Sequence, residues 1–199
     1  MRVGLDFDNT LISYDQLFHR VALDKGLIPE EILQQKNAVR DSMRERGIED
    51  EWTRLQGEIY GSRSLEAEPY PGMQTALKGL SDRQISMFIV SHKTRTPFLG
   101  KQWDLHAAAR SWLEQQGFYD ANRMSWSEDQ VFFELTKEAK VARIVALGCT
   151  HYVDDLPEIL AMLPDSVEKI LFAPSEGAEK HPKWKLMCSW QELPALLNL

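Results

Sequence analysis

The amino-acid sequence predicts an α/β fold, in which a parallel β-sheet carries helices on both faces and a small helical domain follows the first strand. Three observations predict this fold. Short apolar runs alternate along the chain with amphipathic helical segments, which is typical of parallel sheets with right-handed crossovers. Polar residues follow three of the apolar runs directly. A long helical stretch, residues 13–69, separates the first run from the rest of the predicted sheet.

The first predicted strand, residues 3–5, leads into Asp6-Phe7-Asp8-Asn9-Thr10. Apolar side chains alternate with small or acidic ones in this segment, which predicts that Asp6 and Asp8 lie on one side of the backbone. Two carboxylates this close repel each other unless a cation or a proton compensates them. The segment therefore predicts a metal site or a site of proton transfer. The structural alternative is a strand followed by an Asx-type turn, which Asn9 and Thr10 would shape.

Further strands are predicted at residues 85–90, 151–153 and 169–173, with a weaker candidate at 131–133. Capping residues and glycines predict the helices between them. These helices are expected at residues 104–117, 136–148 and 156–163, and a C-terminal helix is expected after Ser189. In the helix that begins at Thr136, we expect Val141, Ile144 and Val145 to form the buried face.

Polar residues stand at the carboxyl ends of three predicted strands. Asp6 and Asp8 follow the first strand, Ser91 ends the second, and Asp154-Asp155 ends a later one. Ligands bind beyond the carboxyl ends of the strands in open α/β sheets. The sequence therefore predicts that these side chains converge on one site at one edge of the sheet.

Residues 13–69 predict a small helical insert, because a simple crossover between parallel strands needs only about a dozen residues. Its helices are expected at residues 16–25, 29–46 and 50–60, and the second should carry Ile32, Val39 and Met43 on one face. The expected domains are residues 1–12 and 70–199 for the α/β core and residues 13–69 for the insert. Residues 94–103 contain Pro, Gly and several basic side chains, which favour a loop or flap.

Composition limits the kind of protein. The net charge of −7 argues against a general nucleic-acid binder and against an anionic membrane surface. No apolar run approaches the roughly 20 residues of a membrane span, and the N-terminus lacks a signal-peptide pattern. Cys149 and Cys188 have no metal-ligand spacing. We therefore expect a cytoplasmic enzyme.

The motifs, in this order, resemble those of the haloacid dehalogenase (HAD) superfamily of phosphatases and phosphotransferases. The first motif, Asp-x-Asp-x-Thr, matches residues 6–10, and Ser91 matches the second. The third is a lysine, either Lys137 or Lys140, and residues 140–144 favour Lys140. The acidic pair at residues 154–155 matches the fourth motif. The resemblance implies a Rossmann-like three-layer core, with the helical insert as the cap domain.

The resemblance also implies roles for the acidic residues. Asp6 would be the nucleophile and Asp8 the general acid and base. Mg²⁺ would be bound by a side-chain oxygen of Asp6, by the backbone carbonyl of Asp8 and by Asp155. Asp154 would support these ligands without binding the ion directly. The roles of Asp154 and Asp155 could be exchanged. Asp8 is absent from the dehalogenases that name the superfamily, so its presence favours phosphoryl transfer.

Three residues would bind the substrate. By resemblance, Ser91 would donate a hydrogen bond to a phosphoryl oxygen and Lys140 would offset negative charge. His92-Lys93-Thr94-Arg95 follows Ser91 and offers cationic side chains for an anionic group. Within this run, His92 is favoured because it adjoins the phosphate position.

The sequence thus predicts a Mg²⁺-dependent phosphatase that hydrolyses a small phosphorylated metabolite through an aspartyl-phosphate. The alternatives are a phosphotransferase or phosphomutase, a phosphatase acting on nucleic-acid ends, and a non-catalytic protein that binds a phosphorylated ligand. The intact acidic motifs argue against the last. The substrate and the oligomeric state are left open by the sequence.

Overall fold

The computed structural model describes residues 1–174 and 181–199 and divides the chain into two compact units. Unit 1 comprises Met1–Ile12, Pro69–Lys93 and Gly117–Leu199, and unit 2 comprises Ser13–Glu68 and Thr94–Gln116. The chain leaves unit 1 through β2 (Ile12–Ser13) and returns through β3 (Glu68–Pro69). These two short strands pair with each other in a two-stranded sheet.

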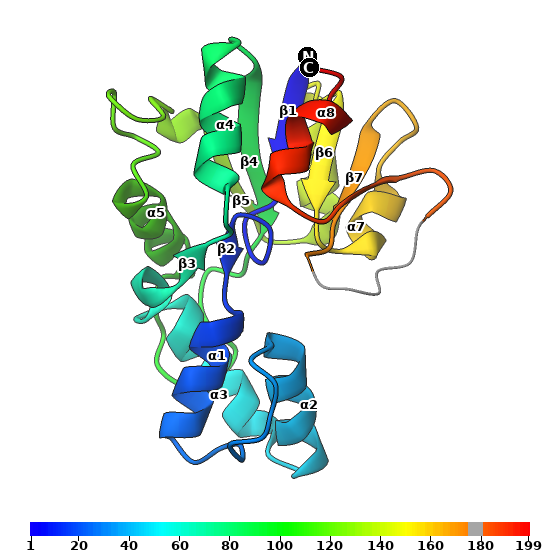
Figure 1. Cartoon of the computed structure of the whole chain (residues 1–199). Coiled ribbons are helices and arrows are strands. Elements are labelled where there is room, and N and C mark those ends of the chain that lie inside the picture. Colours follow the sequence, from blue (N-terminus) through cyan, green and yellow to red (C-terminus); the bar gives the residue numbers. More distant parts are fainter. Residues whose placement is uncertain (175–180) are drawn as a thin grey trace. The chain divides into compact units, whose positions relative to one another are not determined.

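Unit 1 is built around a parallel sheet, which confirms the predicted α/β class (Figure 1). Within the described residues the strand order is β5-β4-β1-β6-β7-β8. The strands are β1 (Arg2–Leu5), β4 (Ser86–His92), β5 (Val131–Glu134), β6 (His151–Asp154), β7 (Glu168–Phe172) and β8 (Lys185–Met187). All but β8 were predicted from the sequence.

The position of β1 in the sheet decides where the acidic residues meet. It lies between β4 and β6, with Leu5 paired to Ile89 on one side and to Val153 on the other. The chain first adds β4 and β5 on one side of β1 and then crosses to add β6, β7 and β8 on the other. Ligand sites of open α/β sheets lie where the strand order reverses in this way. Asp6 directly follows β1, and Asp154 is the last residue of the neighbouring strand β6.

Helices cover both faces of the sheet, as predicted. On one face, α6 (Lys137–Ala146) and α7 (Pro157–Met162) pack against the strands through a core that includes Val90, Ile144, Tyr152 and Ile159. On the other face lie α4 (Met73–Asp82), the 3₁₀ helix η3 (Trp190–Glu192) and α8 (Leu193–Leu196) (Figure 1). A further 3₁₀ helix, η2 (Glu128–Gln130), precedes β5.

Unit 2 is helical within the part of the chain that the structure describes. Its helices are α1 (Asp15–Asp24), α2 (Lys36–Glu45), α3 (Glu49–Tyr60), the 3₁₀ helix η1 (Ser64–Glu66) and α5 (Leu105–Gln115). The rings of Tyr14, Phe18, Trp52 and Tyr60 pack together between α1 and α3.

The predicted helix at residues 29–46 is shorter than expected, because α2 begins only at Lys36. The segment that leads into α2 contacts α1 through backbone atoms instead. The Ile32 carbonyl lies 2.8 Å from the His19 Nε2 atom, and the Lys36 amide donates to the Asp15 carboxylate at 2.8 Å. Tertiary contacts therefore override the helical propensity of residues 29–35, and Ile32 lies outside the helical face on which it was expected.

Residues 94–116 belong to unit 2, although the sequence analysis placed them in the α/β core. The reason is the contact of α5 with the segment around η1. The buried Trp112 indole donates to the Ala67 carbonyl at 2.8 Å, and the Gln115 amide donates to the Leu65 carbonyl at 3.2 Å. Unit 2 is thus assembled from two separate stretches of sequence.

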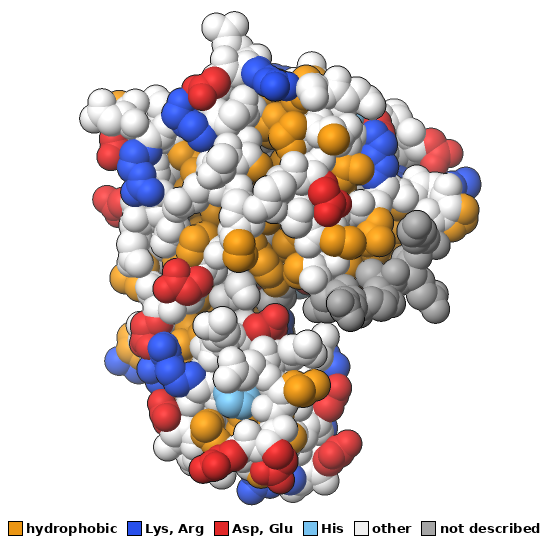
Figure 2. All heavy atoms as spheres, viewed as in Figure 1, with side chains coloured by type: hydrophobic (Ala, Val, Ile, Leu, Met, Phe, Trp, Pro, Cys, Tyr) orange, Lys and Arg blue, Asp and Glu red, His pale blue; other side chains and the backbone are white. Residues whose placement is uncertain are grey.

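Figure 2 shows one face of the molecule, on which acidic and basic side chains are interspersed rather than gathered by sign. Across residues 1–174 and 181–199, no helix has the length and apolar character needed to cross a lipid bilayer.

Candidate active site

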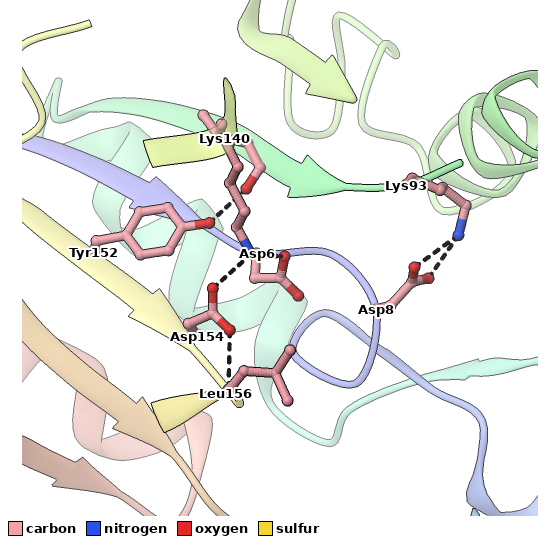
Figure 3. Close-up of polar contacts among 8 residues, drawn as sticks. Asp6, Asp8, Lys93, Lys140, Tyr152, Asp154 and Leu156 are labelled. Atoms are coloured by element: carbon pink, nitrogen blue, oxygen red, sulfur yellow. Dashed lines mark hydrogen bonds and ion pairs between the residues drawn. The ribbon is translucent and has the colours of Figure 1, made fainter. Parts of the chain in front are cut away.

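The end of β1 and the turn after it place the first acidic residues. The Asp6 amide donates to the Val153 carbonyl at 2.9 Å, which extends the pairing with β6 by one residue. The chain then turns, with the Leu11 amide bonded to the Phe7 carbonyl at 3.0 Å and Asn9 in the left-handed region at φ 57°. Because the strand ends before the second acid, its alternation does not continue to Asp8. Figure 3 shows Asp6 and Asp8 turned toward different lysines.

Lys140 lies between two buried carboxylates (Figure 3). Its Nζ atom is 2.6 Å from Asp6 Oδ1 and 2.6 Å from Asp154 Oδ2, and the residue is only 1% exposed. Burial alone would lower the pKa of Lys140, but the charges of Asp6 and Asp154 outweigh burial and raise it above its ordinary value. Lys140 is therefore a permanent cation in the centre of the cluster.

Lys137, the other lysine that fits the third motif, lies outside this cluster. It is partly exposed, and its Nζ atom pairs with Glu158 at 2.8 Å. Thr136 accepts a hydrogen bond from the Ala139 amide and begins α6 as predicted. The buried face of α6 contains Lys140 and Ile144, whereas Val145 is 49% exposed. Of the expected apolar face, Ile144 is buried as predicted, but Lys140 and not Val145 lies beside it on the buried side of the helix.

Asp6, Asp154 and Asp155 form an acidic trio that is suited to a divalent cation. One ligand atom from each lies within 4.8 Å of the others. Oxygen ligands on opposite sides of one Mg²⁺ are about 4.2 Å apart, since each bond is about 2.1 Å long. Three carboxylates and the Lys140 ammonium leave two negative charges, which one divalent cation would balance. The residues therefore fit Mg²⁺ in both spacing and charge.

Asp154 and Asp155 differ in their surroundings. Asp154 is fully buried, and its two oxygens accept hydrogen bonds from Lys140 and from the Leu156 amide at 2.9 Å. Burial and the charge of Asp6 raise the pKa of Asp154 to about 7, and Lys140 opposes this shift. Asp155 is partly exposed. Both oxygens of Asp154 are thus engaged by protein donors.

Asp8 forms a second ion pair with Lys93 (Figure 3). The Lys93 ammonium donates to both carboxylate oxygens, at 2.9 Å and 2.7 Å, and Lys93 is only 4% exposed. The ammonium also lies 5.5 Å from the centre of the Phe7 ring. These contacts fix the position of the Asp8 carboxylate at the edge of the sheet.

Position in the sequence favours His92 within the run after Ser91, whereas the structure brings the next residue, Lys93, to the Asp8 carboxylate. The His92 Nε2 atom lies 3.2 Å from the Leu135 carbonyl. Ser91 is buried in β4 and pairs with Phe133. Strand alternation could have identified Lys93, because side chains two residues apart share a face and Ser91 had already been assigned to the site.

The sequence matches no known family model and no curated protein. Solved structures do resemble it. A putative phosphatase from Clostridium difficile has a TM-score of 0.62 and 14% identity, covering 98% of this chain and 97% of its own. A predicted phosphatase from Clostridium acetobutylicum has a TM-score of 0.60 and 14% identity, covering 100% and 98%. A HAD-superfamily hydrolase of subfamily IA from Geobacter sulfurreducens has a TM-score of 0.59 and 13% identity, covering 98% and 95%.

At these identities the likeness concerns the fold, over nearly the whole length of each chain. The sequence motifs predicted a parallel sheet with acidic residues meeting at one edge, and the chain has such a sheet, with Asp6, Asp154 and Asp155 close together. The chain therefore has the fold of the HAD-superfamily hydrolases.

Proposed function

We propose that this protein is a Mg²⁺-dependent phosphatase that hydrolyses a small phosphorylated metabolite through an aspartyl-phosphate at Asp6. The observation that carries the proposal is the bridging of Asp6 and Asp154 by the buried Lys140, with Asp155 beside them. Phosphoryl transfer needs a positioned nucleophile and positive charge around the phosphoryl oxygens. The cluster offers a carboxylate at the carboxyl end of the central strand and a cation held against it.

In the first step, a carboxylate oxygen of Asp6 attacks phosphorus and the ester P–O bond breaks. Asp8 donates a proton to the departing alkoxide oxygen. In the second step, water attacks phosphorus, Asp8 takes its proton, and the bond between phosphorus and Asp6 breaks to release phosphate. Lys140 compensates negative charge throughout, and Ser91 donates a hydrogen bond to a phosphoryl oxygen.

Asp6 and Asp155 would hold Mg²⁺ through side-chain oxygens, and the Asp8 carbonyl would complete the protein ligands. When bound, the ion would neutralise phosphoryl charge and polarise the phosphoryl group. The spacing of the acidic trio and its two uncompensated negative charges support this assignment.

Metal titration should distinguish the two neighbouring acids. We expect Asp155→Asn to raise the Mg²⁺ concentration for half-maximal phosphate release by more than about 100-fold, because a direct ligand is lost. Asp154→Asn should raise it by about 10-fold, the size of effect found for groups that orient ligands. The measurement is phosphate release against Mg²⁺ concentration for both variants. A larger effect at Asp154 would exchange the two roles.

Lys93 is proposed to position Asp8 for proton donation. The effect of removing Lys93 on the rate should therefore depend on the leaving group of the ester. Lys93→Met should slow hydrolysis of an alkyl phosphate about tenfold more than that of p-nitrophenyl phosphate, whose leaving group needs no proton. Lys93→Arg should restore part of the difference, because it keeps the cation. The measurement is kcat for both esters. Equal losses on both esters would show that Lys93 does not act through Asp8.

The direct test of the function is phosphate release from a panel of phosphorylated sugars, nucleotides, amino acids and short oligonucleotides, with Mg²⁺ and with EDTA. Release that requires Mg²⁺ supports the phosphatase. Comparing the rate on the best metabolite with the rate on the best oligonucleotide shows which substrate class the enzyme prefers. A folded protein that releases no phosphate from any compound but transfers it to an added alcohol would be a phosphotransferase. A folded protein that shows neither phosphate release nor phosphate transfer would contradict the proposal.

A further inference from the structure

Tyr152 is a fully buried tyrosine in β6, on the face of the sheet that α6 and α7 cover. Strand alternation puts its side chain on the same face as that of Asp154, two residues later. Lys140 reaches this face from α6, and its Nζ atom lies 5.6 Å from the centre of the Tyr152 ring (Figure 3). The ring therefore lies next to the cation of the acidic cluster, within the range of cation–π contacts.

The Tyr152 side chain crosses the central part of the sheet from β6 to β4. The strand β1 lies between these two strands, and its residue Gly4 is paired with Tyr152. A Cβ atom at Gly4 would lie 2.6 Å from the Tyr152 Cδ2 atom, which is closer than such atoms come in proteins. Glycine therefore leaves the space through which the ring reaches across β1, and a glycine inside a strand often marks such a close approach.

The hydroxyl of Tyr152 donates a hydrogen bond to the Val90 carbonyl on β4 (Figure 3). This carbonyl belongs to the same planar peptide unit as the nitrogen of Ser91, so the hydrogen bond restrains the backbone that carries Ser91. Burial and the charges of Asp154 and Asp6 raise the pKa of Tyr152. The hydroxyl therefore keeps its proton and remains a hydrogen-bond donor.

A packing role alone would not require the hydroxyl of Tyr152. Phenylalanine has the same ring and fills nearly the same volume, and a buried hydroxyl is costly unless it finds a partner. Here the partner is the backbone directly before Ser91, and the ring lies beside Lys140. Tyr152 thus connects the two residues that are proposed to compensate the negative charge of the phosphoryl group.

We propose that Tyr152 is a positioning residue of the phosphoryl-transfer site, and that its hydroxyl holds Ser91 where Ser91 donates to a phosphoryl oxygen. The proposal rests on the phosphatase function proposed above, and every residue that it uses belongs to unit 1. Small displacements of a binding group have large effects, because a misplacement of about 1 Å can lower a rate about 100-fold. Tyr152 acts through Ser91 and does not itself contact the substrate.

A double-mutant cycle separates positioning from packing. Tyr152→Phe keeps the ring and should lower kcat/KM on the best ester of the panel about tenfold, because a buried acceptor loses its donor. In a Ser91→Ala background, the same change should lower kcat/KM by less than about twofold, because the hydroxyl that Tyr152 positions has been removed. A loss of packing would lower kcat/KM by the same factor in both backgrounds.

Tyr119→Phe is the matched control, since it makes the same chemical change at a partly exposed position of unit 1 outside the acidic cluster. It should retain the kcat/KM of the native protein. The melting temperature of each variant establishes that folded proteins are compared. Equal losses from Tyr152→Phe in the two backgrounds, or no loss in the native background, would overturn the positioning role and leave the phosphatase standing.

If no ester is hydrolysed, the phosphatase fails, and the same cycle is measured on the dissociation constant of inorganic phosphate in the presence of Mg²⁺. Tyr152→Phe should then weaken phosphate binding about tenfold in the native background and less than about twofold in the Ser91→Ala background. Equal weakening in both backgrounds, or no weakening in the native background, would overturn the role of Tyr152. A native protein that does not bind phosphate would overturn it as well.

Discussion

Replacement of Asp6 by asparagine is expected to lower phosphate release by about a thousandfold or more, because a neutral amide is a poor nucleophile. The fold should persist, since asparagine has nearly the same shape and one of the three clustered negative charges is removed. The measurement is kcat on the best substrate of the panel, together with the melting temperature of the variant.

The matched control for this variant is Asp82→Asn, which makes the same chemical change at an exposed position on α4. Asp82→Asn should retain the activity of the native protein. Substantial turnover by Asp6→Asn would exclude Asp6 as the nucleophile. A loss shared by both variants would point to a general effect of the substitution rather than to the site.

Replacement of Lys140 by methionine is expected to lower the free energy of unfolding by about 3–5 kcal/mol, the cost of breaking a buried ion pair by removing one partner. Methionine fills similar volume but leaves Asp6 and Asp154 buried without their cation. The measurement is urea denaturation in EDTA, so that no divalent cation replaces the lost charge. Activity should fall as well, because charge compensation near the nucleophile is removed.

Lys137→Met is the control, since it removes a lysine three residues away on the same helix. Its partner Glu158 is exposed, and exposed ion pairs contribute about 0–1 kcal/mol. We therefore expect Lys137→Met to change the free energy of unfolding by less than about 1 kcal/mol. Equal destabilisation by the two variants would contradict the central position of Lys140 in the cluster.

The sequence was sufficient to predict the parallel sheet and the acidic cluster, because both depend on local patterns. Apolar runs that end in polar residues identify strands and their carboxyl ends, and these ends meet at one edge of any parallel sheet. Asp6 and Asp154 are brought together for this reason. The preference for Lys140 over Lys137 rested on the family resemblance, and the geometry places Lys140 in the cluster.

Other features depend on contacts between distant residues, which local patterns do not contain. Residues 29–35 have a helical composition, but hydrogen bonds with His19 and Asp15 of α1 decide their conformation. The three-residue strand β8 is too short to show an alternating pattern. Residues 94–116 join unit 2 through Trp112 and its neighbours.

The charged residues of the site were the hardest to assign from the sequence. The apolar pattern of α6 predicted the buried Ile144 correctly, but it included the exposed Val145 and could not show that Lys140 is buried. Lys93 is a buried lysine within a basic run, and its partner Asp8 lies 85 positions away in the sequence. Strand alternation places Lys93 on the face of Ser91, but no periodic signal links Lys93 to Asp8, and only the three-dimensional structure identifies this ion pair.

The most direct test of the account is to trap covalent phosphate on Asp6. The protein is mixed with Mg²⁺ and ³²P-labelled acetyl phosphate, quenched with acid during turnover, and analysed for label that hydroxylamine removes, as expected for an acyl phosphate. We predict labelled protein for the native chain, with the label in the peptide that contains Asp6, and none for Asp6→Asn. Phosphate release by a native protein that carries no covalent label at any quench time would contradict the proposed aspartyl-phosphate.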